Sequence, residues 1–141
     1  MLVYGGSQVE ELRKGRHVVS MLHAHLVFVT KYRGKVLSRI HLDRLQEIFQ
    51  SVCNDFDVSL SEFNGEKDHV HLLVEYSPKV QLSKLVNSLK GVSSRLLRKE
   101  FADIRIRYWK GVLWSPSYFV GSCGGAPIDI LRRYVENQGK H

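Results

Sequence analysis

Apolar residues recur every three or four positions in two long stretches of the chain, which is the spacing of one face of an α-helix. The first stretch predicts a helix over about 42–56, and the second predicts an amphipathic helix over about 82–100. A third helix is expected over about 127–138, because Gly124-Gly125 breaks the backbone and Pro127 suits a first helical position. The apolar positions of the first two helices are Leu42, Leu45, Ile48, Phe49, Val52, Leu82, Leu85, Leu89, Val92 and Leu96.

Shorter stretches rich in β-branched and apolar residues predict strands over about 21–30, 58–63, 69–75, 104–109 and 118–121. Asn64-Gly65 is a turn signal of the kind that joins two adjacent strands. Apart from the two terminal segments, the first six of these elements run strand, helix, strand, strand, helix, strand, an order typical of a ferredoxin-like sandwich. The predicted fold class is therefore α+β, with an antiparallel sheet, helices on one of its faces and a separate C-terminal helix.

The composition fits a single folded domain. The chain has 141 residues, of which 43% are hydrophobic and 25% charged, so we expect one compact domain over 1–141. Residues 1–18 are polar and basic and are expected to form a loose arm, while the helix over 127–138 is expected to move on its linker. The formal net charge of +7 favours a polyanionic partner, most commonly nucleic acid, although a solvated basic surface also explains it.

Several other classes of protein do not fit the sequence. Cys53 and Cys123 have neither metal-ligand spacing nor the arrangement of a disulfide framework, so a reducing cytoplasm is expected. No stretch approaches the ~18 apolar residues of a membrane span, and the N-terminus lacks a signal-peptide pattern. No glycine-rich phosphate loop is present, so no nucleotide cofactor is expected.

Two histidines lie two residues apart in the strand predicted over 69–75. Because side chains alternate across a strand, His69 and His71 point to one face, while the apolar residues of the strand point to the other. The apolar side would face the helices, so the histidines would lie on the open face, accessible to a long polymer. Paired imidazoles supply half of a metal site. His23 and His25 repeat the spacing, either as ligands or as side chains that pack or hydrogen-bond near the site.

The predicted C-terminal helix offers a candidate nucleophile. Tyr134 and Gln138 are four residues apart, so a phenol and an amide share one face of this helix. A phenol has a pKa near ~10 and becomes reactive at neutral pH only beside a cation or a base. The pair suggests a tyrosine nucleophile beside a bound cation, whereas a helical tyrosine next to Arg132 and Arg133 more often serves packing.

These segments, taken in order, resemble a known family. Three segments carry the likeness: Leu26-Val27-Phe28-Val29-Thr30-Lys31-Tyr32-Arg33, Asp68-His69-Val70-His71-Leu72-Leu73 and Leu113-Trp114-Ser115-Pro116-Ser117-Tyr118. With Tyr134 they resemble the small single-tyrosine transposases of the HUH class, the IS200-like transposases of bacterial and archaeal insertion sequences. That class is named for a histidine-hydrophobic-histidine strand. Lys67 is a departure, since relatives often carry proline there at the turn into the strand.

The resemblance implies an enzyme that cuts and rejoins single-stranded DNA at the ends of an insertion sequence. Tyr134 would form a 5′-phosphotyrosine bond and release a 3′-hydroxyl, and His69, His71 and Gln138 would hold a divalent metal ion, Mg²⁺ or Mn²⁺. The family also implies recognition of a DNA hairpin near each element end by a homodimer. In that dimer the final helix would cross over, so that the histidines of one subunit work with the tyrosine of the other.

Basic residues outside this set are candidates for contacts with DNA phosphates. Those chosen from charge and placement are Arg33, Lys35, Lys90, Arg95 and Arg98. The last three lie in the helix predicted over 82–100, where a solvated helix face explains them equally well. Residues 105–110 interleave cations with Tyr108 and Trp109, a mix suited to base stacking on single strands. The alternative for that segment is a strand with a buried tryptophan.

Other functions compete with transposition. Histidine-triad hydrolases also use alternating histidines, but the next alternate position here is Leu73. A noncatalytic or domesticated nucleic-acid-binding relative would keep the fold and the basic surface, and the intact His69, His71, Tyr134 and Gln138 set argues against it. Within the same chemistry, a relative that processes chromosomal repeated palindromes is a further alternative.

Overall fold

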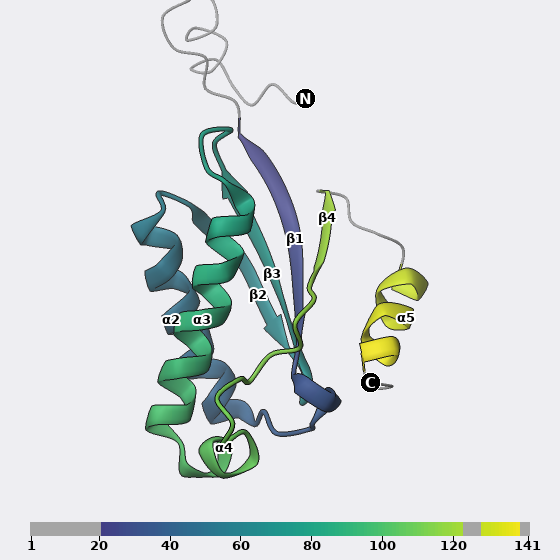
Figure 1. Ribbon diagram of the computed structural model, residues 1–141. Coiled ribbons are helices and arrows are strands. Elements are labelled where there is room, and N and C mark those ends of the chain that lie inside the picture. The colour runs from purple at the N-terminus through teal and green to yellow at the C-terminus, as the bar shows by residue number, and fades with distance from the viewer. Residues whose placement is uncertain (1–20, 123–127, 139–141) are drawn as a thin grey trace, which may run out of the picture.

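The computed structural model describes residues 21–122 and 128–138 (Figure 1). The predicted N-terminal arm and the Gly124-Gly125 linker therefore lie outside the described residues. The elements are β1 (Leu22–Val29), η1 (Lys31–Arg33), α2 (Arg39–Asp55), β2 (Ser59–Gly65), β3 (His69–Tyr76), α3 (Leu82–Glu100), α4 (Ala102–Arg107), β4 (Phe119–Ser122) and α5 (Ile128–Gln138). Within these ranges no helix is long and apolar enough to cross a membrane.

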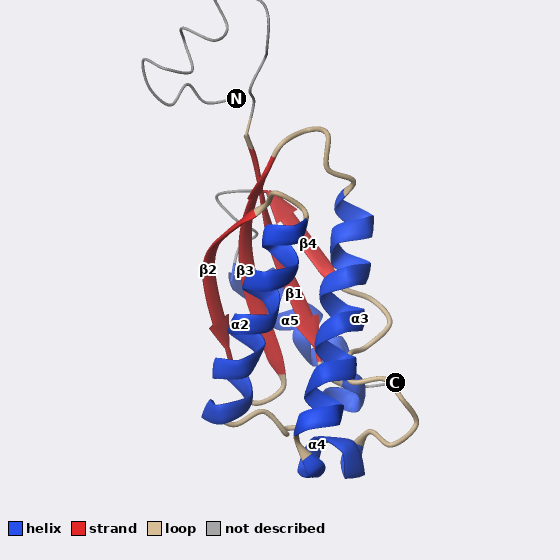
Figure 2. Cartoon of the chain, turned by 90° about the vertical axis from the view of Figure 1, so that its left-hand side faces the viewer, coloured by secondary structure: helices blue, strands red, loops and turns tan. Residues whose placement is uncertain are grey.

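The four strands form one antiparallel sheet in the order β2-β3-β1-β4. β1 and β3 pair along their whole length, with Val29 opposite His69 and Leu26 opposite Leu72. Helices α2 and α3 lie side by side on one face of the sheet, whereas α5 lies on the other side (Figures 1 and 2). The predicted α+β fold, with a ferredoxin-like order of elements and helices on one face, is confirmed.

The hydrophobic core fills the space between the sheet and the two long helices. Phe28 of β1, Phe49 of α2 and Trp114 are fully or almost fully buried and contact one another through their rings. The indole N–H of Trp114 donates a 2.8 Å hydrogen bond to the hydroxyl of Ser93 on α3, so no polar group of this residue is buried unpaired. The open face of the sheet takes no part in this cluster.

The strand predicted over 104–109 is wrong, because α4 occupies most of this segment. Apolar residues at alternate positions resemble a strand, yet Ile104 and Tyr108 also have the i, i+4 spacing of one helical face. Both are buried, whereas Ile106 is 73% exposed on the opposite side. The alternative of a buried tryptophan in this segment is also wrong, because Trp109 is largely exposed.

The predicted turn at Asn64-Gly65 is displaced toward the C-terminus. Both residues still pair within the sheet, and the chain reverses at residues 66–68, where the Glu66 N–H donates to the His69 carbonyl. Gly65 packs closely against α2, since a Cβ atom there would displace the end of the Leu42 side chain. Helix α2 begins earlier than predicted, at Arg39, with the Ser38 N–H donating to the ring of His41.

Candidate active site

His69 and His71 lie on the open face of the sheet, as predicted from their spacing on β3. The residues that alternate with them, Val70, Leu72 and Val74, are fully buried beneath the helices. The two imidazole rings are 4.9 Å apart between centroids, and the His69 side chain remains 16% exposed. Packing on one face of the strand therefore fixes the position of the histidines on the other face.

Asp68 orients the first histidine. The Nδ1 of His69 lies 2.8 Å from Oδ1 of Asp68, so the ring donates its Nδ1 proton to a carboxylate and keeps a lone pair on Nε2. The second carboxylate oxygen lies 3.6 Å from Nε of Arg33, one of the predicted phosphate contacts. A carboxylate behind a histidine in this way fixes its tautomer and raises its basicity toward a metal ion.

His25 of β1 contacts the second histidine. Its Nε2 lies 3.1 Å from Nδ1 of His71, and the two rings stack with centroids 5.2 Å apart. Burial, with the neighbouring His69 and His25, lowers the pKa of His71 to about 4, and burial lowers that of His25 as well. His71 is therefore a neutral imidazole near pH 7, which is the form that binds metals.

The other predicted pair, His23 and His25, does not act as a unit. His23 lies 3.0 Å from the carboxylate of Glu75 at the far end of β3, and only His25 reaches the His69–His71 pair. In the part of the chain that the structure describes, no three or more His, Cys, Asp and Glu side chains are grouped to hold a metal. A glutamine ligand such as Gln138 lies outside that set of residue types.

Tyr134 and Gln138 share one face of α5 and meet the same loop between α4 and β4. The Tyr134 hydroxyl is 3.2 Å from the hydroxyl of Ser117, and its ring packs beside Phe119 at 5.8 Å between centroids. Oε1 of Gln138 accepts hydrogen bonds from Ser115 at 2.6 Å and from Ser117 at 2.9 Å. Burial raises the pKa of the Tyr134 phenol, and the Ser117 hydrogen bond acts in the opposite direction. Neither serine is predicted as a site residue, although both lie in the Leu113–Tyr118 segment that carries the resemblance.

Lys90 of α3 donates hydrogen bonds to this loop. Its ammonium donates to the carbonyls of Ser115 at 2.8 Å and Pro116 at 3.1 Å and lies 5.5 Å from the centre of the Tyr118 ring. Burial lowers its pKa below the usual value for lysine. Lys90 thus joins α3 to the loop that holds α5. A sequence pattern that places a cation on a helix gives no sign of such a contact.

The remaining predicted phosphate contacts are distributed over two elements. Lys35 and Arg95 are exposed, whereas Arg98 donates from Nε to the Ser94 hydroxyl at 3.4 Å on the same helix. Arg33 lies beside the histidine pair through Asp68. The structure therefore brings Arg33 to the site and leaves Lys35 and Arg95 accessible elsewhere.

Helix α5 lies on the side of the sheet opposite α2 and α3 (Figures 1 and 2), and the burial of the alternating residues of β3 beneath α2 and α3 puts His69 and His71 on the same side as α5. Within the described residues no hydrogen bond joins His69 or His71 to Tyr134 or Gln138. The histidine pair is held by the sheet, and the tyrosine helix contacts the loop over residues 115–117, Phe119 of β4 and η1.

Comparisons with known proteins identify relatives of this chain. A family model described as "Transposase IS200 like" matches residues 18–138. The ISDra2 transposase TnpA of Deinococcus radiodurans is 30% identical over 128 residues, which cover 91% of this chain and 91% of the relative. A transposase for insertion sequence element IS200 from Salmonella typhimurium is 30% identical over 114 residues, covering 81% of this chain and 74% of the relative.

Solved structures show the same likeness. A crystal structure of a candidate transposase from Deinococcus radiodurans R1 superimposes with a TM-score of 0.80 at 33% identity, over 88% of this chain and 95% of that chain. A REP-associated tyrosine transposase bound to a REP hairpin gives a TM-score of 0.56 at 11% identity, over 86% of this chain and 67% of that chain, a likeness of fold alone. Because the family match spans β1 to α5 and the relatives cover most of the chain, this protein belongs to the IS200-like transposases, enzymes that cut and transfer DNA strands.

Proposed function

We propose that the protein cuts and rejoins single-stranded DNA at the ends of an insertion sequence, with Tyr134 as nucleophile. The phenol oxygen would attack the scissile phosphate, forming the Tyr134–phosphate bond at the 5′ side while the bond to the 3′ oxygen breaks. The phenol loses its proton, and the departing oxygen gains one to become a 3′-hydroxyl. The phosphotyrosine linkage keeps the energy of the DNA ester, so rejoining needs no nucleotide.

The environment of Tyr134 suits a nucleophile that is inactive until DNA and cation are present. Burial raises the pKa of the phenol, so alone it stays protonated near pH 7. Ser117 holds the hydroxyl in place without removing its proton. A nearby positive charge would favour the phenolate, which is the usual way in which a tyrosine is activated.

The side chains on the open face fit a divalent cation, Mg²⁺ or Mn²⁺. Asp68 leaves Nε2 of His69 with a lone pair. If Nδ1 of His71 donates its proton to Nε2 of His25, then Nε2 of His71 is free in the same way. The amide oxygen of Gln138 would supply the third ligand. A cation held there polarises the phosphate and stabilises the negative charge that develops on it.

A homodimer is the assembly that handles two DNA ends with one tyrosine in each chain. Because α5 is attached through contacts with the loop over residues 115–117, with Phe119 at the start of β4 and with η1, and is not a strand of the sheet, it is an element that two subunits could exchange. In the exchanged form, His69 and His71 of one subunit work with Tyr134 and Gln138 of the other. The DNA partner is proposed to carry hairpins near its ends, with Arg33, Lys35, Arg95 and Arg98 at its phosphates and Lys90 positioning the loop.

Mixed dimers test the exchanged arrangement. When a His71→Ala chain is combined with a Tyr134→Phe chain, an exchanged dimer contains one complete site and regains activity that each variant lacks alone. If the mixed dimer stays inactive, each site is formed within one chain and the exchange is ruled out.

The observation that carries the proposal is the placement of Tyr134 and the histidine pair on the same open face of the sheet. Labelled single-stranded DNA from the sequence flanking this reading frame is incubated with protein and Mg²⁺ or Mn²⁺, and a denaturing gel is examined for a protein–DNA adduct. We expect a metal-dependent adduct, absent from Tyr134→Phe. Tyr118→Phe is the matched control, because it also loses one hydroxyl but keeps the ring beside Lys90. DNA binding without any adduct would favour the noncatalytic alternative.

A further inference from the structure

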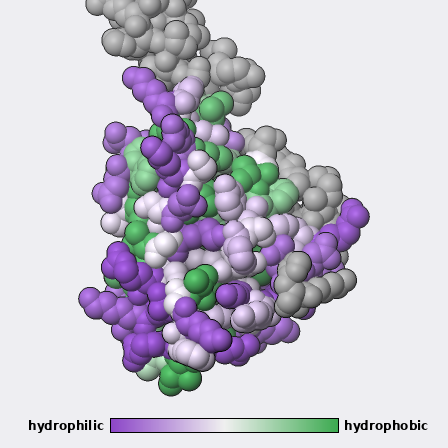
Figure 3. Space-filling view, viewed as in Figure 1, coloured by the Kyte–Doolittle hydropathy of each residue, from purple (hydrophilic) through white to green (hydrophobic). Residues whose placement is uncertain are grey.

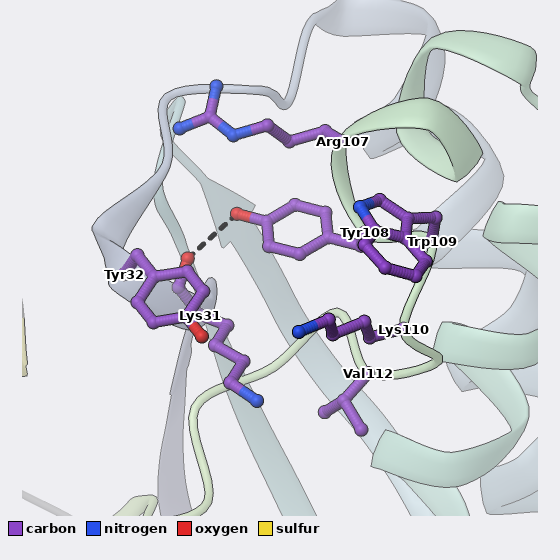
Figure 4. A pocket seen from close by; sticks show the side chains of 7 residues that line it. All are labelled: Lys31, Tyr32, Arg107, Tyr108, Trp109, Lys110 and Val112. Carbon is purple, nitrogen blue, oxygen red and sulfur yellow. Dashed lines mark hydrogen bonds between the residues drawn. The ribbon is translucent and has the colours of Figure 1, made fainter.

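A pocket outside the proposed catalytic set lies between η1 and the end of α4 (Figure 4). It has a volume of about 260 Å³ and opens to solvent. Its lining residues are Lys31, Tyr32, Arg107, Tyr108, Trp109, Lys110 and Val112. None of these is among the residues proposed to bind metal, attack phosphate or contact phosphates. The pocket contains most of the segment that interleaves cations with aromatic rings.

Two aromatic rings of this pocket are exposed to an unusual degree. Trp109 is 72% exposed and Tyr32 is 64% exposed, while the smaller apolar side chain of Val112 lines the pocket with them. Figure 3 shows a largely hydrophilic surface with separate apolar spots, one of them at the end of the molecule where Figure 1 places α4. Exposed aromatic rings beside a hollow commonly mark a binding site, because they do not contribute their area to the core.

The charged groups around the rings are all positive. The Lys110 ammonium lies 5.2 Å from the centre of the Trp109 ring, and the Lys31 ammonium lies 5.5 Å from that of Tyr32. Arg107 borders the same pocket. Within residues 21–122 and 128–138, no salt bridge engages any of these cations. Their charge is therefore available to an anionic partner.

The backbone at Tyr32 and Arg33 has a left-handed conformation that residues other than glycine rarely adopt. Tyr32 has φ of 62° and Arg33 has φ of 51°, which costs on the order of 1 kcal/mol or more per residue. The Tyr108 hydroxyl donates to the Lys31 carbonyl at 2.8 Å, and the Lys31 N–H donates to the Leu113 carbonyl at 2.8 Å. These bonds fix the turn, so the Tyr32 ring is presented to solvent by a rigid segment.

We infer that this pocket binds one unpaired nucleobase of a DNA strand, stacked against Trp109 and Tyr32, with Lys31 and Lys110 beside the neighbouring phosphates. Exposed rings with unpaired cations are the combination by which proteins hold single strands without reading their sequence. That the polymer is DNA rests on the proposed function. The turn that carries Tyr32 continues to Arg33, which pairs with Asp68 behind His69, so the held strand lies next to the histidine pair.

Tryptophan fluorescence tests the inference with the full-length protein in EDTA, where no cleavage is needed. The second tryptophan, Trp114, is buried and bonded to Ser93, so quenching on binding reports Trp109. The probes are single-stranded thymidine octanucleotide and an octamer of abasic nucleotides with the same number of phosphates. We expect the thymidine strand to quench the fluorescence and to bind about tenfold more tightly than the abasic strand, within the range that base stacking supplies.

Variants assign the effect to the pocket. Because these variants lose the reporting tryptophan, their affinities are read from the fluorescence anisotropy of a dye-labelled strand. Trp109→Ala should weaken binding of the thymidine strand about tenfold, and Trp109→Phe should keep most of the affinity because a ring remains. Ile40→Ala, which removes an equally exposed apolar side chain from α2, should change nothing. Lys110→Gln should reduce the slope of log affinity against log salt by about one, whereas Lys84→Gln on α3 should not. Each variant is checked for an unchanged urea unfolding midpoint.

Three outcomes would overturn the inference. The first is equal affinity for the thymidine and abasic strands, and the second is an affinity of Trp109→Ala for the thymidine strand equal to that of the wild type. The third is equal fluorescence quenching by an octaglutamate peptide, which would make the pocket a site for acidic peptides. Because the adduct assay reads bond formation at Tyr134 and not occupancy of this pocket, its success with any of these outcomes would retain the proposed function and reject the base site. Failure of every variant and of the wild type to bind DNA, with no adduct, would remove both.

Discussion

The two faces of the central sheet are built in opposite ways, although the same strands supply both. Toward α2 and α3, β3 presents Val70, Leu72 and Val74, all fully buried among apolar neighbours. Toward the other side it presents His69 and His71, which contact polar groups and remain partly open. Burial on one face stabilises the fold, and the same packing fixes the positions of His69 and His71 on the other face.

The same contrast separates the two halves of the proposed active site. The histidines are part of the sheet, where each buried apolar side chain contributes roughly 1.5–3 kcal/mol. The contacts of the tyrosine helix include hydrogen bonds with the hydroxyls of Ser115 and Ser117, a ring contact with Phe119 and packing beside η1, and such hydrogen bonds contribute about 0.5–1.5 kcal/mol each. The histidine half should therefore be as stable as the domain, while α5 should detach at lower cost.

The largest expected effect is on the buried face. Leu72→Ala should lower the free energy of unfolding by about 2–5 kcal/mol, because it removes a fully buried side chain from a closed core. Val135→Ala on α5 should cost less than about 1 kcal/mol, since the helix contributes little to global unfolding. Urea denaturation followed by circular dichroism measures both. Equal losses would show that α5 is part of the same cooperative unit.

The exclusion of water from the buried face should lower the reactivity of the Cys53 thiol. Cys53 on α2 is fully buried, which raises its pKa to about 11. The thiolate is the reactive form, and a pKa raised from 9.0 to about 11 lowers the fraction of thiolate. The rate of alkylation of the folded protein near pH 8 should therefore fall by about 100-fold. The raised pKa also makes folding less favourable as pH rises from about 9 to 11, where the unfolded thiol ionises first.

Iodoacetamide labelling of a Cys123→Ser variant measures this protection, with the same protein in urea as the unfolded control. A folded rate close to the rate in urea would mean that solvent reaches the space between α2 and the sheet. The contrast between the two faces would then be smaller than the burial of Leu72 and Cys53 indicates.

On the open face, the test is whether Asp68 acts on the proposed metal site. Asp68→Asn should weaken Mn²⁺ binding by about 10–100-fold, because the carboxylate behind His69 orients the ring and raises its basicity. Glu75→Gln is the matched control, since Glu75 contacts His23 at the other end of the strand. Calorimetric titration with Mn²⁺ separates binding from activity. Equal losses in both variants would contradict a specific role for Asp68.

The part of this structure that periodic patterns control could be predicted from the sequence. The helix over 82–100 and the direction of His69 and His71 follow from spacings that the structure obeys. The segment around Ile104 could not be assigned in this way, because two buried residues four apart satisfy a strand and a helix equally, and only the exposed side of Ile106 distinguishes them. Local patterns therefore determine elements best where the pattern is long.

Contacts between segments far apart in the chain could not be predicted from the sequence patterns. His25 reaches His71 only because β1 and β3 pair in a particular register, and Lys90 reaches the carbonyls of a loop 25 residues away. Ser115 and Ser117 acquire a role only when α5 lies against them. Spacing within one element predicts which candidate site residues share a face, whereas His25, Lys90 and the two serines reach the site from other elements.

The smallest expected effect concerns the attachment of α5. Ser117→Ala removes the hydroxyl shared by Tyr134 and Gln138, so the helix should open more often while the sheet is unaffected. A loss of about 0.5–1.5 kcal/mol corresponds to amide hydrogen exchange in α5 that is about 2–12-fold faster. Hydrogen exchange read by mass spectrometry resolves α5 from β3, which should keep its protection.

Ser83→Ala is the control for this last measurement, because Ser83 is an exposed hydroxyl on α3 and its loss should change neither region. Faster exchange in both α5 and β3 of Ser117→Ala would mean that the two halves of the site unfold together, and the contrast between them would fail. Unchanged exchange in α5 would instead assign its attachment to the other contacts of the helix, among them the contact between the Tyr134 and Phe119 rings and its packing beside η1. Only faster exchange confined to α5 supports a candidate nucleophile on a helix that leaves its loop independently of β3.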